Sequence, residues 1–307
     1  MMQLKKESSK GINVLSLFDG MSCGQIALDK LGIEVDNYFA SEIDKYAIQV
    51  TKHNYPNTKH IGDVTQVKGV DLPKIDLLIG GSPCQGFSFA GKQLNFEDPR
   101  SKLFFEFVRL LEETKPKYFL LENVKMKKEY QDVISNYLGC EPIEISSSKF
   151  IPQNRKRLYW TNVDVPQPKK QEWNIEDYID GDGFATQCKL ELNPRRVRFE
   201  KVNVFNTLTS VYWKGISGSS RPAISIRESY LHEDREAHRM LTPTECERLQ
   251  TVPIGYTDCV SKTQRYKMLG NGWTVDVIAH IFNQMALQER SHIVYNYLLN
   301  DIVKNTQ

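Results

Sequence analysis

The sequence predicts an α/β fold, an open and mostly parallel sheet with helices on both faces, joined to a small β-rich region. Apolar runs alternate with helical segments up to residue 161, an order that builds a parallel sheet. Residues 162–240 instead carry prolines and short alternating runs such as "VNVFNTLTSVYW". Helical periodicity returns afterwards. We therefore expect residues 11–161 and 241–307 to form one domain around a separate region at 162–240.

Four apolar runs bounded by turn residues predict the buried strands of the first region. They are "INVLSLF" (12–18), "EVDNYFASE" (34–42), "KIDLLIGG" (74–81) and "KYFLLENV" (117–124). The segments between them predict helices at "GQIALDKLG" (24–32), "DKYAIQVTKHN" (44–54) and "PRSKLFFEFVRLLEETKP" (99–116). A sheet of this kind binds ligands beyond the carboxyl ends of its strands.

Three helices are expected after residue 240. "LTPTECERLQ" (241–250) has Thr242 at the N-cap, Pro243 at the first helical position and Glu245 three residues after the cap. This combination is typical of a helix start closed by a capping box. "SKTQRYKMLG" (261–270) and "WTVDVIAHIFNQMALQER" (273–290) follow with apolar residues at helical spacing.

The composition is that of a globular protein without a membrane segment. The 307 residues are 40% hydrophobic and 25% charged, and no run of about 18 apolar residues occurs. The N-terminal "MMQLKKESSKG" lacks the apolar core of a secretory signal. Six scattered cysteines without a CxxC pair disfavour a metal site and are typical of reduced thiols. We therefore expect a cytoplasmic protein with no metal and no membrane contact.

The charge is informative only locally. A net charge of +2 neither requires nor excludes nucleic acid. The segment from Pro194 to Met240 contains nine Lys and Arg residues but only five Asp and Glu residues. Arg195, Arg196 and Arg198 are clustered within it. Charge alone favours a solvated face over a binding surface for such a cluster.

A glycine turn and a spaced acid predict a site for a nucleoside-containing cofactor. The first strand opens onto "FDGMSCG" (18–24), where Gly20 and Gly24 permit a tight turn at a helix N-terminus. Glu42 follows about 20 residues later, where a carboxylate can bind ribose hydroxyls; the alternative is a surface acid. Asp63 in "GDVTQV" could meet an adenine amino group, although alone it is more typical of a turn cap.

Cys84 is the candidate nucleophile. It lies in "GGSPCQGFSFAG" (80–91), after a proline, among glycines and at the end of a predicted strand. A cysteine after an apolar strand is commonly a buried packing residue. A helix N-terminus or a cation would instead lower its pKa and make it reactive. The shape of the turn supports both interpretations equally.

A carboxyl and two guanidiniums are expected at the same edge. Glu122 in "LLENV" ends the next strand, where desolvation can raise the pKa of a carboxyl and allow it to donate a proton. Arg155 and Arg157 in "QNRKRLYW" are two residues apart, so on a strand both face one side. They indicate a site for an anion or a polar base edge; the alternative is a surface ion pair.

Together these segments resemble the cytosine-5 DNA methyltransferases that use S-adenosylmethionine. The motifs occur in the family's order and span residues 14 to 280. They are "FDGMSCG", "SEID", "GDV", "GGSPCQGFS", "DPRSKLFFEF", "LLENV", "QNRKRLYW", "LTPTECERLQ" and "RYKMLGNGWTVDVI". The resemblance implies a class I methyltransferase fold, a Rossmann-like sheet, with residues 162–240 as the target-recognition domain.

The resemblance also implies a mechanism. Cys84 matches the thiolate that adds to C6 of cytosine, and Glu122 matches the acid that contacts ring N3. Arg157 matches the residue that steadies the base and the carboxylate, with Arg155 assisting. C5 then takes the methyl group and loses a proton, and Cys84 is eliminated. Because C6 is inaccessible in a stacked duplex, the base must be flipped out.

The family's binding positions map onto further residues. Those lining the S-adenosylmethionine pocket match Phe18, Asp19, Gly20, Glu42, Ile43, Asp63, Val64, Pro83, Leu103, Asn271, Gly272 and Trp273. Those expected to contact DNA are Ser88, Arg195, Arg196, Arg198 and Arg221, since arginines there can reach phosphates or guanine edges. The implied partner is double-stranded DNA. A cognate restriction endonuclease and a solitary enzyme both remain open, and bacterial or phage origin is expected.

Two motifs depart from the usual bacterial pattern. The turn at Met21 lacks a glycine that many bacterial members have and looks more like the vertebrate de novo type. "GNGW" replaces the usual Gly-Asn-Ser, which leaves open the cofactor contacts of Gly272 and Trp273.

Three rival functions remain in view at this stage. An RNA cytosine-5 methyltransferase on the same fold would need a different recognition surface. A non-catalytic DNA-binding paralogue is disfavoured, because Cys84, Glu122 and Arg157 are all present. A nucleotide-dependent oxidoreductase would need to bind nicotinamide.

Overall fold

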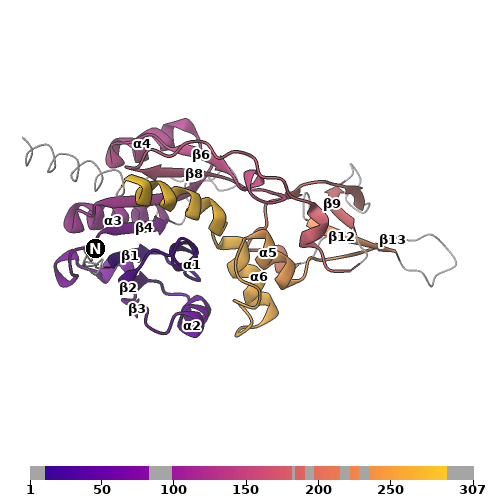
Figure 1. The fold of residues 1–307 in the computed structure, drawn as a ribbon, viewed down its shortest axis with the longest axis horizontal. Coiled ribbons are helices and arrows are strands. Elements are labelled where there is room, and N and C mark those ends of the chain that lie inside the picture. The colour runs from indigo at the N-terminus through magenta and orange to yellow at the C-terminus, as the bar shows by residue number, and fades with distance from the viewer. Residues whose placement is uncertain are drawn as a thin grey trace, which may run out of the picture.

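A computed structural model describes most of the chain (Figure 1). The described residues are 11–82, 99–181, 184–190, 197–214, 222–227 and 236–288. Figure 1 shows a small second sheet at one end of the molecule, with helical segments from the last third of the chain between it and the first strands.

A seven-stranded sheet forms the centre of the main domain. Its order is β3-β2-β1-β4-β5-β8-β6. The strands are β1 (Ile12–Leu17), β2 (Val35–Ser41), β3 (Lys59–His60), β4 (Leu77–Gly81), β5 (Tyr118–Val124), β6 (Ile143–Ser146) and β8 (Lys156–Thr161). The five adjacent strands β3, β2, β1, β4 and β5 pair in parallel. Strand β8 runs antiparallel to both of its neighbours, β5 and β6. The prediction of a mostly parallel sheet is confirmed.

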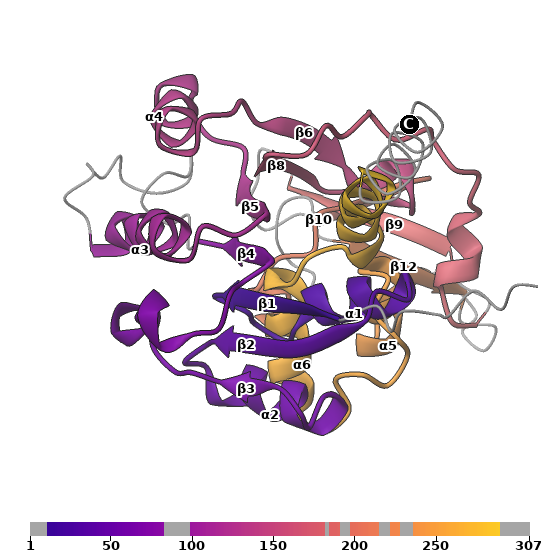
Figure 2. The same ribbon diagram turned by 60° about the vertical axis from the view of Figure 1, so that its left-hand side comes forward.

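Helices cover both faces of this sheet because successive strand residues point to opposite sides. The helices are α1 (Cys23–Lys30), α2 (Lys45–Asn54), α3 (Pro99–Thr114) and α4 (Lys128–Leu138), with a further helix at 275–288. Val14 belongs to the core under α1, α2 and the 275–288 helix. Its neighbour Leu15 belongs to the core under α3 and α4. Figure 2 shows α3 and α4 on one side and the last helix, in yellow, on the other.

The region after residue 162 forms a second, antiparallel sheet. Its order is β10-β9-β12-β13. The strands are β9 (Phe184–Leu190), β10 (Val197–Lys201), β12 (Pro222–Arg227) and β13 (Glu236–Arg239). A short pair, β7 (Gln153–Asn154) with β11 (Phe205–Asn206), ties this region to the segment just before β8. The β-rich character predicted for this region is confirmed.

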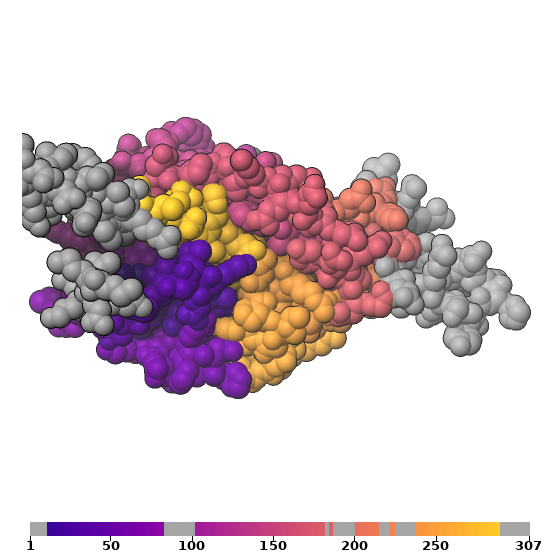
Figure 3. All heavy atoms as spheres, viewed as in Figure 1, coloured from indigo at the N-terminus to yellow at the C-terminus, as the bar shows by residue number. Residues whose placement is uncertain are grey.

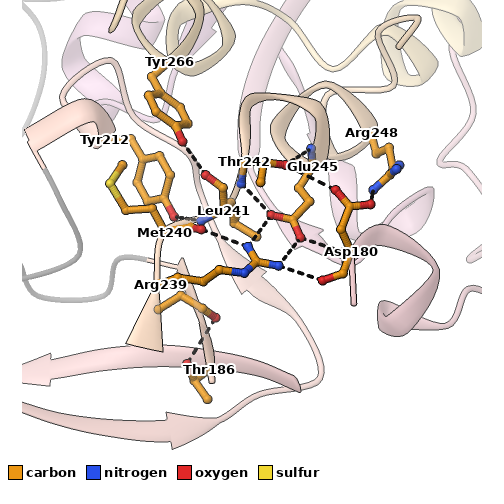
Figure 4. A network of polar contacts seen from close by, with 11 residues as sticks. Asp180, Thr186, Tyr212, Arg239, Met240, Leu241, Thr242, Glu245, Arg248 and Tyr266 are labelled. Atoms are coloured by element: carbon orange, nitrogen blue, oxygen red, sulfur yellow. Dashed lines mark hydrogen bonds and ion pairs between the residues drawn. The ribbon is translucent and has the colours of Figure 1, made fainter. Parts of the chain in front are cut away.

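A buried carboxylate joins the second sheet to α5 (Pro243–Leu249) (Figure 4). Glu245 is fully buried, and it closes the predicted capping box with Thr242. Its two oxygens also accept hydrogen bonds at 2.8 Å from Arg239, which ends β13. Asp180 contributes both a backbone N–H to Glu245, at 2.7 Å, and a carboxylate to Arg248 of α5. This network fixes the position of the second sheet against the helical return, which is formed by residues 241–288.

The helical return packs onto the first strands of the chain. In Figure 3 its orange surface lies against the indigo and violet residues of the N-terminal half. Tyr256 donates to the backbone oxygen of Met21 at 2.7 Å, and Gln49 of α2 donates to that of Cys259 at 2.8 Å. No helix in the described ranges has the length and apolar character that crossing a membrane requires.

Candidate active site

A cavity of about 390 Å³ lies at the carboxyl ends of the parallel strands. Its walls come from the ends of β1, β2, β4 and β5, the start of β8 and residues 267–273, which include the end of α6 (Lys262–Asn271). The chain order reverses between the adjacent strands β1 and β4, and open α/β sheets bind ligands at such a switch point. The volume falls in the range of small-molecule sites.

The turn after β1 fixes a carboxylate on one wall. Gly20 has a left-handed φ of 59°, and its backbone N–H donates to Glu42 Oε2 at 2.8 Å. The other oxygen, Oε1, accepts from the backbone N–H groups of Ile43 and Asp44, at 2.7 and 2.8 Å. Three backbone donors therefore hold the Glu42 carboxylate at the end of β2, and its predicted contact with ribose hydroxyls stays a prediction.

Asp19 is the most perturbed acid of this turn. It accepts hydrogen bonds from the hydroxyl of Tyr38, at 2.8 Å, and from that of Ser22. Burial raises its pKa to about 6, since desolvation of the carboxylate outweighs these hydrogen bonds.

Only part of the predicted cofactor set lines the cavity. Those that do are Phe18, Asp19, Gly20, Glu42, Asn271, Gly272 and Trp273. Ile43 lies beside Glu42 with 75% of its side chain exposed. Asp63 caps the short helix η1 (Val64–Gln66) by accepting from the Thr65 N–H at 2.9 Å, and Val64 is buried in the core under α3. Leu103 packs against the same core, and Pro83 lies outside the described residues.

Glu122 lines the cavity at the end of β5, which β4 separates from β1 in the sheet. It ends β5, is 9% exposed, and pairs in register with Gly81 of β4. Arg157 Nε lies 3.0 Å from its Oε1. The indole N–H of Trp273 donates to its Oε2 at 3.1 Å. The acid is therefore held at both oxygens.

The two arginines do different things. Arg157 binds Glu122 directly. Arg155 is 4% exposed and donates to three backbone carbonyls, those of Leu208 (3.0 Å), Gly270 (3.1 Å) and Gly272 (2.9 Å). Burial lowers the pKa of Arg155 to about 9, and the neighbouring Arg157 adds to this shift. Arg155 therefore ties the second region and α6 to the cavity wall.

Several predicted residues lie where the structure gives no side chain. Cys84, Ser88, Arg195, Arg196 and Arg221 lie outside the described residues, and for Arg198 only the backbone within β10 is described. Ser82, the last described residue before Cys84, lines the cavity, and its hydroxyl accepts from Asn123 Nδ2 at 3.2 Å. The roles predicted for these residues stay predictions.

Sequence reasoning missed other lining residues. They are Cys23, Asp44, Ala47, Gly81, Ser82, Asn123, Val124, Lys267, Met268 and Gly270. Most of them flank motifs that the sequence analysis did single out, at the ends of predicted strands or next to Asn271. Across the described ranges, no three His, Cys, Asp or Glu side chains cluster closely enough to hold a metal ion.

Comparison with known proteins gives one consistent result. The family described as C-5 cytosine-specific DNA methylase matches residues 12–181 and 167–287. The Type II methyltransferase M1.ScrFI of Lactococcus lactis subsp. cremoris is 33% identical to this chain, and the match covers 89% of this chain and 77% of that protein. The Type II methyltransferase M.NlaX of Neisseria lactamica is also 33% identical, and the match covers 89% of this chain and 95% of that protein.

Among solved structures, the Entamoeba histolytica methyltransferase EhMeth superposes with a TM-score of 0.71. It is 19% identical, and the match covers 90% of this chain and 98% of the other, which shows a shared fold. The two relatives named above are bacterial. The comparisons give no support to the expected likeness of the Met21 turn to the vertebrate de novo type.

Proposed function

This chain belongs to the C-5 cytosine-specific DNA methylase family, and from this premise we propose that the cavity holds S-adenosylmethionine beside a flipped cytosine. The enzyme is a DNA cytosine-5 methyltransferase with a class I methyltransferase fold. The observation that carries the proposal is the 3.0 Å contact of Arg157 with Glu122, in the cavity that Glu42 also lines.

The glycine-turn wall fits the cofactor that the family requires. Glu42 uses part of its acceptor capacity on three backbone N–H groups, and a carboxylate has about four acceptor sites. The remaining capacity suits the two hydroxyls of a ribose. The exposed side chain of Ile43 offers an apolar face for a purine ring. When bound, S-adenosylmethionine supplies the methyl group.

The part of the cavity at Glu122 fits cytosine. Cys84 supplies a thiolate that bonds to C6 of the base, and Glu122 contacts N3, where charge builds as that bond forms. After C5 has gained its methyl group and lost its proton, the C6–sulfur bond breaks and frees the thiol. Arg157 holds Glu122 for this contact. Arg155 supports the wall rather than the base, because its donors are used on backbone carbonyls.

Duplex DNA is the substrate that the family implies. We propose that residues 162–240 recognise the target site, with Arg195, Arg196, Arg198 and Arg221 as contacts to phosphates or base edges. Ser88 is proposed to contact DNA near the flipped base. The Type II names of two relatives support a cognate restriction endonuclease as a further partner.

Bisulfite sequencing tests the function directly. We expect genomic DNA from cells expressing the chain to carry 5-methylcytosine at one short recurring site, and DNA from cells expressing Cys84→Ser to carry none. Transfer RNA from the same cells is sequenced in parallel. Methylation of RNA alone would support the RNA enzyme, and methylation of neither nucleic acid would support a non-catalytic paralogue.

A further inference from the structure

Two donors on different segments share the carboxylate of Glu122. Arg157 on β8 approaches Oε1 at 3.0 Å, and the indole N–H of Trp273 donates to Oε2 at 3.1 Å. Glu122 is 9% exposed, so few water molecules compete for these oxygens. A hydrogen bond to a charged, poorly solvated group is among the stronger ones in proteins.

The backbone that carries Trp273 is fixed on both sides. The Gly272 carbonyl accepts from Arg155 Nη2 at 2.9 Å. The hydroxyl of Thr274, a 2% exposed residue, donates to Gln250 Oε1 at 2.9 Å. The residues before and after Trp273 are therefore anchored, and the direction of the indole is set by the fold.

Glycine at position 81 leaves the space that this contact needs. A Cβ at Gly81 would lie 3.0 Å from the Trp273 indole nitrogen and 3.1 Å from Glu122 Oε2. Both distances are tighter than ordinary carbon contacts. The end of β4 is thus shaped around the bond between the indole and the carboxylate.

We propose that Trp273 is a positioning residue for methyl transfer, because its indole N–H orients the Glu122 carboxylate toward N3 of the base. The inference rests on the proposed role of Glu122. The proposal also gives Arg155 a role. Arg155 holds the Gly272 carbonyl and so helps to place Trp273 against the Glu122 carboxylate, whereas Arg157 contacts that carboxylate directly. Both arginines of the motif then serve one acid.

Trp273 also lines the cavity, so a simple cofactor contact is the competing explanation. The two explanations predict different kinetics. Trp273→Phe keeps an aromatic ring and removes the N–H. We expect kcat to fall about ten- to hundredfold, while KM for S-adenosylmethionine stays within about twofold, since a misplaced catalytic group slows the reacting step.

Trp160→Phe is the matched control. The indole N–H of Trp160 is also buried and hydrogen-bonded, to Ser135 Oγ at 3.0 Å, but it lies in the core under α3 and α4 and does not line the cavity. We expect this variant to keep the wild-type kcat. An unchanged kcat for Trp273→Phe would overturn the inference. A raised KM for S-adenosylmethionine at unchanged kcat would also overturn it, in favour of the cofactor contact.

Nuclear magnetic resonance tests the bond without relying on activity. The chain has four tryptophans, so the indole N–H signal missing from Trp273→Phe belongs to Trp273. In Glu122→Ala we expect this signal to move upfield in the proton dimension. In Glu112→Ala, which removes an exposed glutamate near the end of α3 that does not line the cavity, the signal should stay. An unmoved signal in Glu122→Ala would exclude the bond. A wild type that methylates no DNA would instead refute the proposed function, even with the bond intact.

Discussion

At the scale of single residues, the site is a set of donors arranged around two carboxylates. Glu42 is held by backbone N–H groups and Glu122 by the side chains of Arg157 and Trp273. The first arrangement leaves a carboxylate free to accept from hydroxyls. The second leaves an acid whose direction is fixed by two neighbours, as expected of a group that must meet one ring atom.

The role proposed for Glu122 predicts a selective loss of activity in Glu122→Gln. The amide keeps the size of the side chain and still accepts from Trp273, but it cannot supply a proton. We expect kcat to fall about 10²- to 10⁴-fold, the usual contribution of an acid or base. Affinity for S-adenosylhomocysteine, measured by calorimetry, should change little. Loss of that affinity, with kcat preserved, would place Glu122 on the cofactor side instead.

Asp19 predicts a pH dependence of stability. Its pKa is raised from 3.8 to about 6 in the fold, so between these values the folded state holds a proton that the unfolded chain has lost. The contribution of Asp19 to the free energy of unfolding is therefore fully present below about pH 3.8 and falls, by about 3 kcal/mol in total, as pH rises to about 6.

Urea unfolding of the wild type and of Asp19→Asn, at several pH values from 4 to 7.5, measures this contribution. The wild type should lose stability relative to the variant as pH rises to about 6, and the difference should then level off. Asp36→Asn, which removes an exposed charge on β2, is the control. A wild-type-to-variant difference that stays flat or rises over this window would contradict the account.

At the scale of elements, much of the fold could be predicted from the sequence. Apolar runs ended by glycine or acidic residues marked β1, β2, β4 and β5, and the capping box marked α5, because those signals are local. The segment between residues 125 and 154 was not assigned in advance, although it holds α4 and β6. The N-cap of α4 is Lys127, which makes no side-chain cap and gave no start signal.

The candidate site was only partly predictable, for a reason that the contacts make plain. Strand-end residues such as Glu42 and Glu122 could be placed together because parallel strands end at one edge. The bond from Trp273 to Glu122 joins residues 151 positions apart, and that from Arg155 to Gly272 spans 117. No local pattern encodes such pairs. Asp63 caps η1, one of the two roles that the sequence left open, and its predicted contact with an adenine amino group stays a prediction.

Close backbone packing of α6 predicts an intolerant glycine. A Cβ at Gly270 would lie 2.2 Å from the carbonyl carbon of Thr209, so the helix and the 208–210 segment leave no room for a methyl group. We expect Gly270→Ala to lower the free energy of unfolding by about 3 kcal/mol, the cost of a severe overpacking. Thr263→Ala, on the exposed face of α6, should be neutral or slightly stabilising. Urea unfolding compares them, and a Gly270→Ala as stable as the wild type would refute this packing.

At the scale of the whole molecule, two sheets are joined by the helical return and a few buried polar groups. Glu245 holds Arg239 at the end of β13 and caps α5, while Arg155, just before β8, reaches α6 and the segment after β11. The cavity lies where these parts meet. Its geometry therefore depends on contacts far from the reacting atoms.

The Glu245 network predicts a large loss of stability when the carboxylate is removed. Glu245→Ala leaves Arg239 without its carboxylate partner and removes the acceptor of two backbone N–H groups, at Asp180 and Thr242 (Figure 4). We expect the free energy of unfolding to fall by about 3–5 kcal/mol, as when one partner of a buried pair is deleted. The exposed Glu172→Ala is the control. An equal, small loss in both variants would show that the network does not hold the two sheets together.

We propose that Cys84 bonds to C6 of a flipped cytosine during methyl transfer. This step is tested by incubating the enzyme with S-adenosylmethionine and a long duplex in which every cytosine is 5-fluorocytosine, so that no knowledge of the target site is needed. Fluorine at C5 blocks the proton loss that frees the thiol. We predict a protein–DNA adduct that survives denaturation for the wild type and none for Cys84→Ser. An adduct formed equally well by Cys84→Ser, or absent from a wild type that methylates ordinary DNA, would contradict the account.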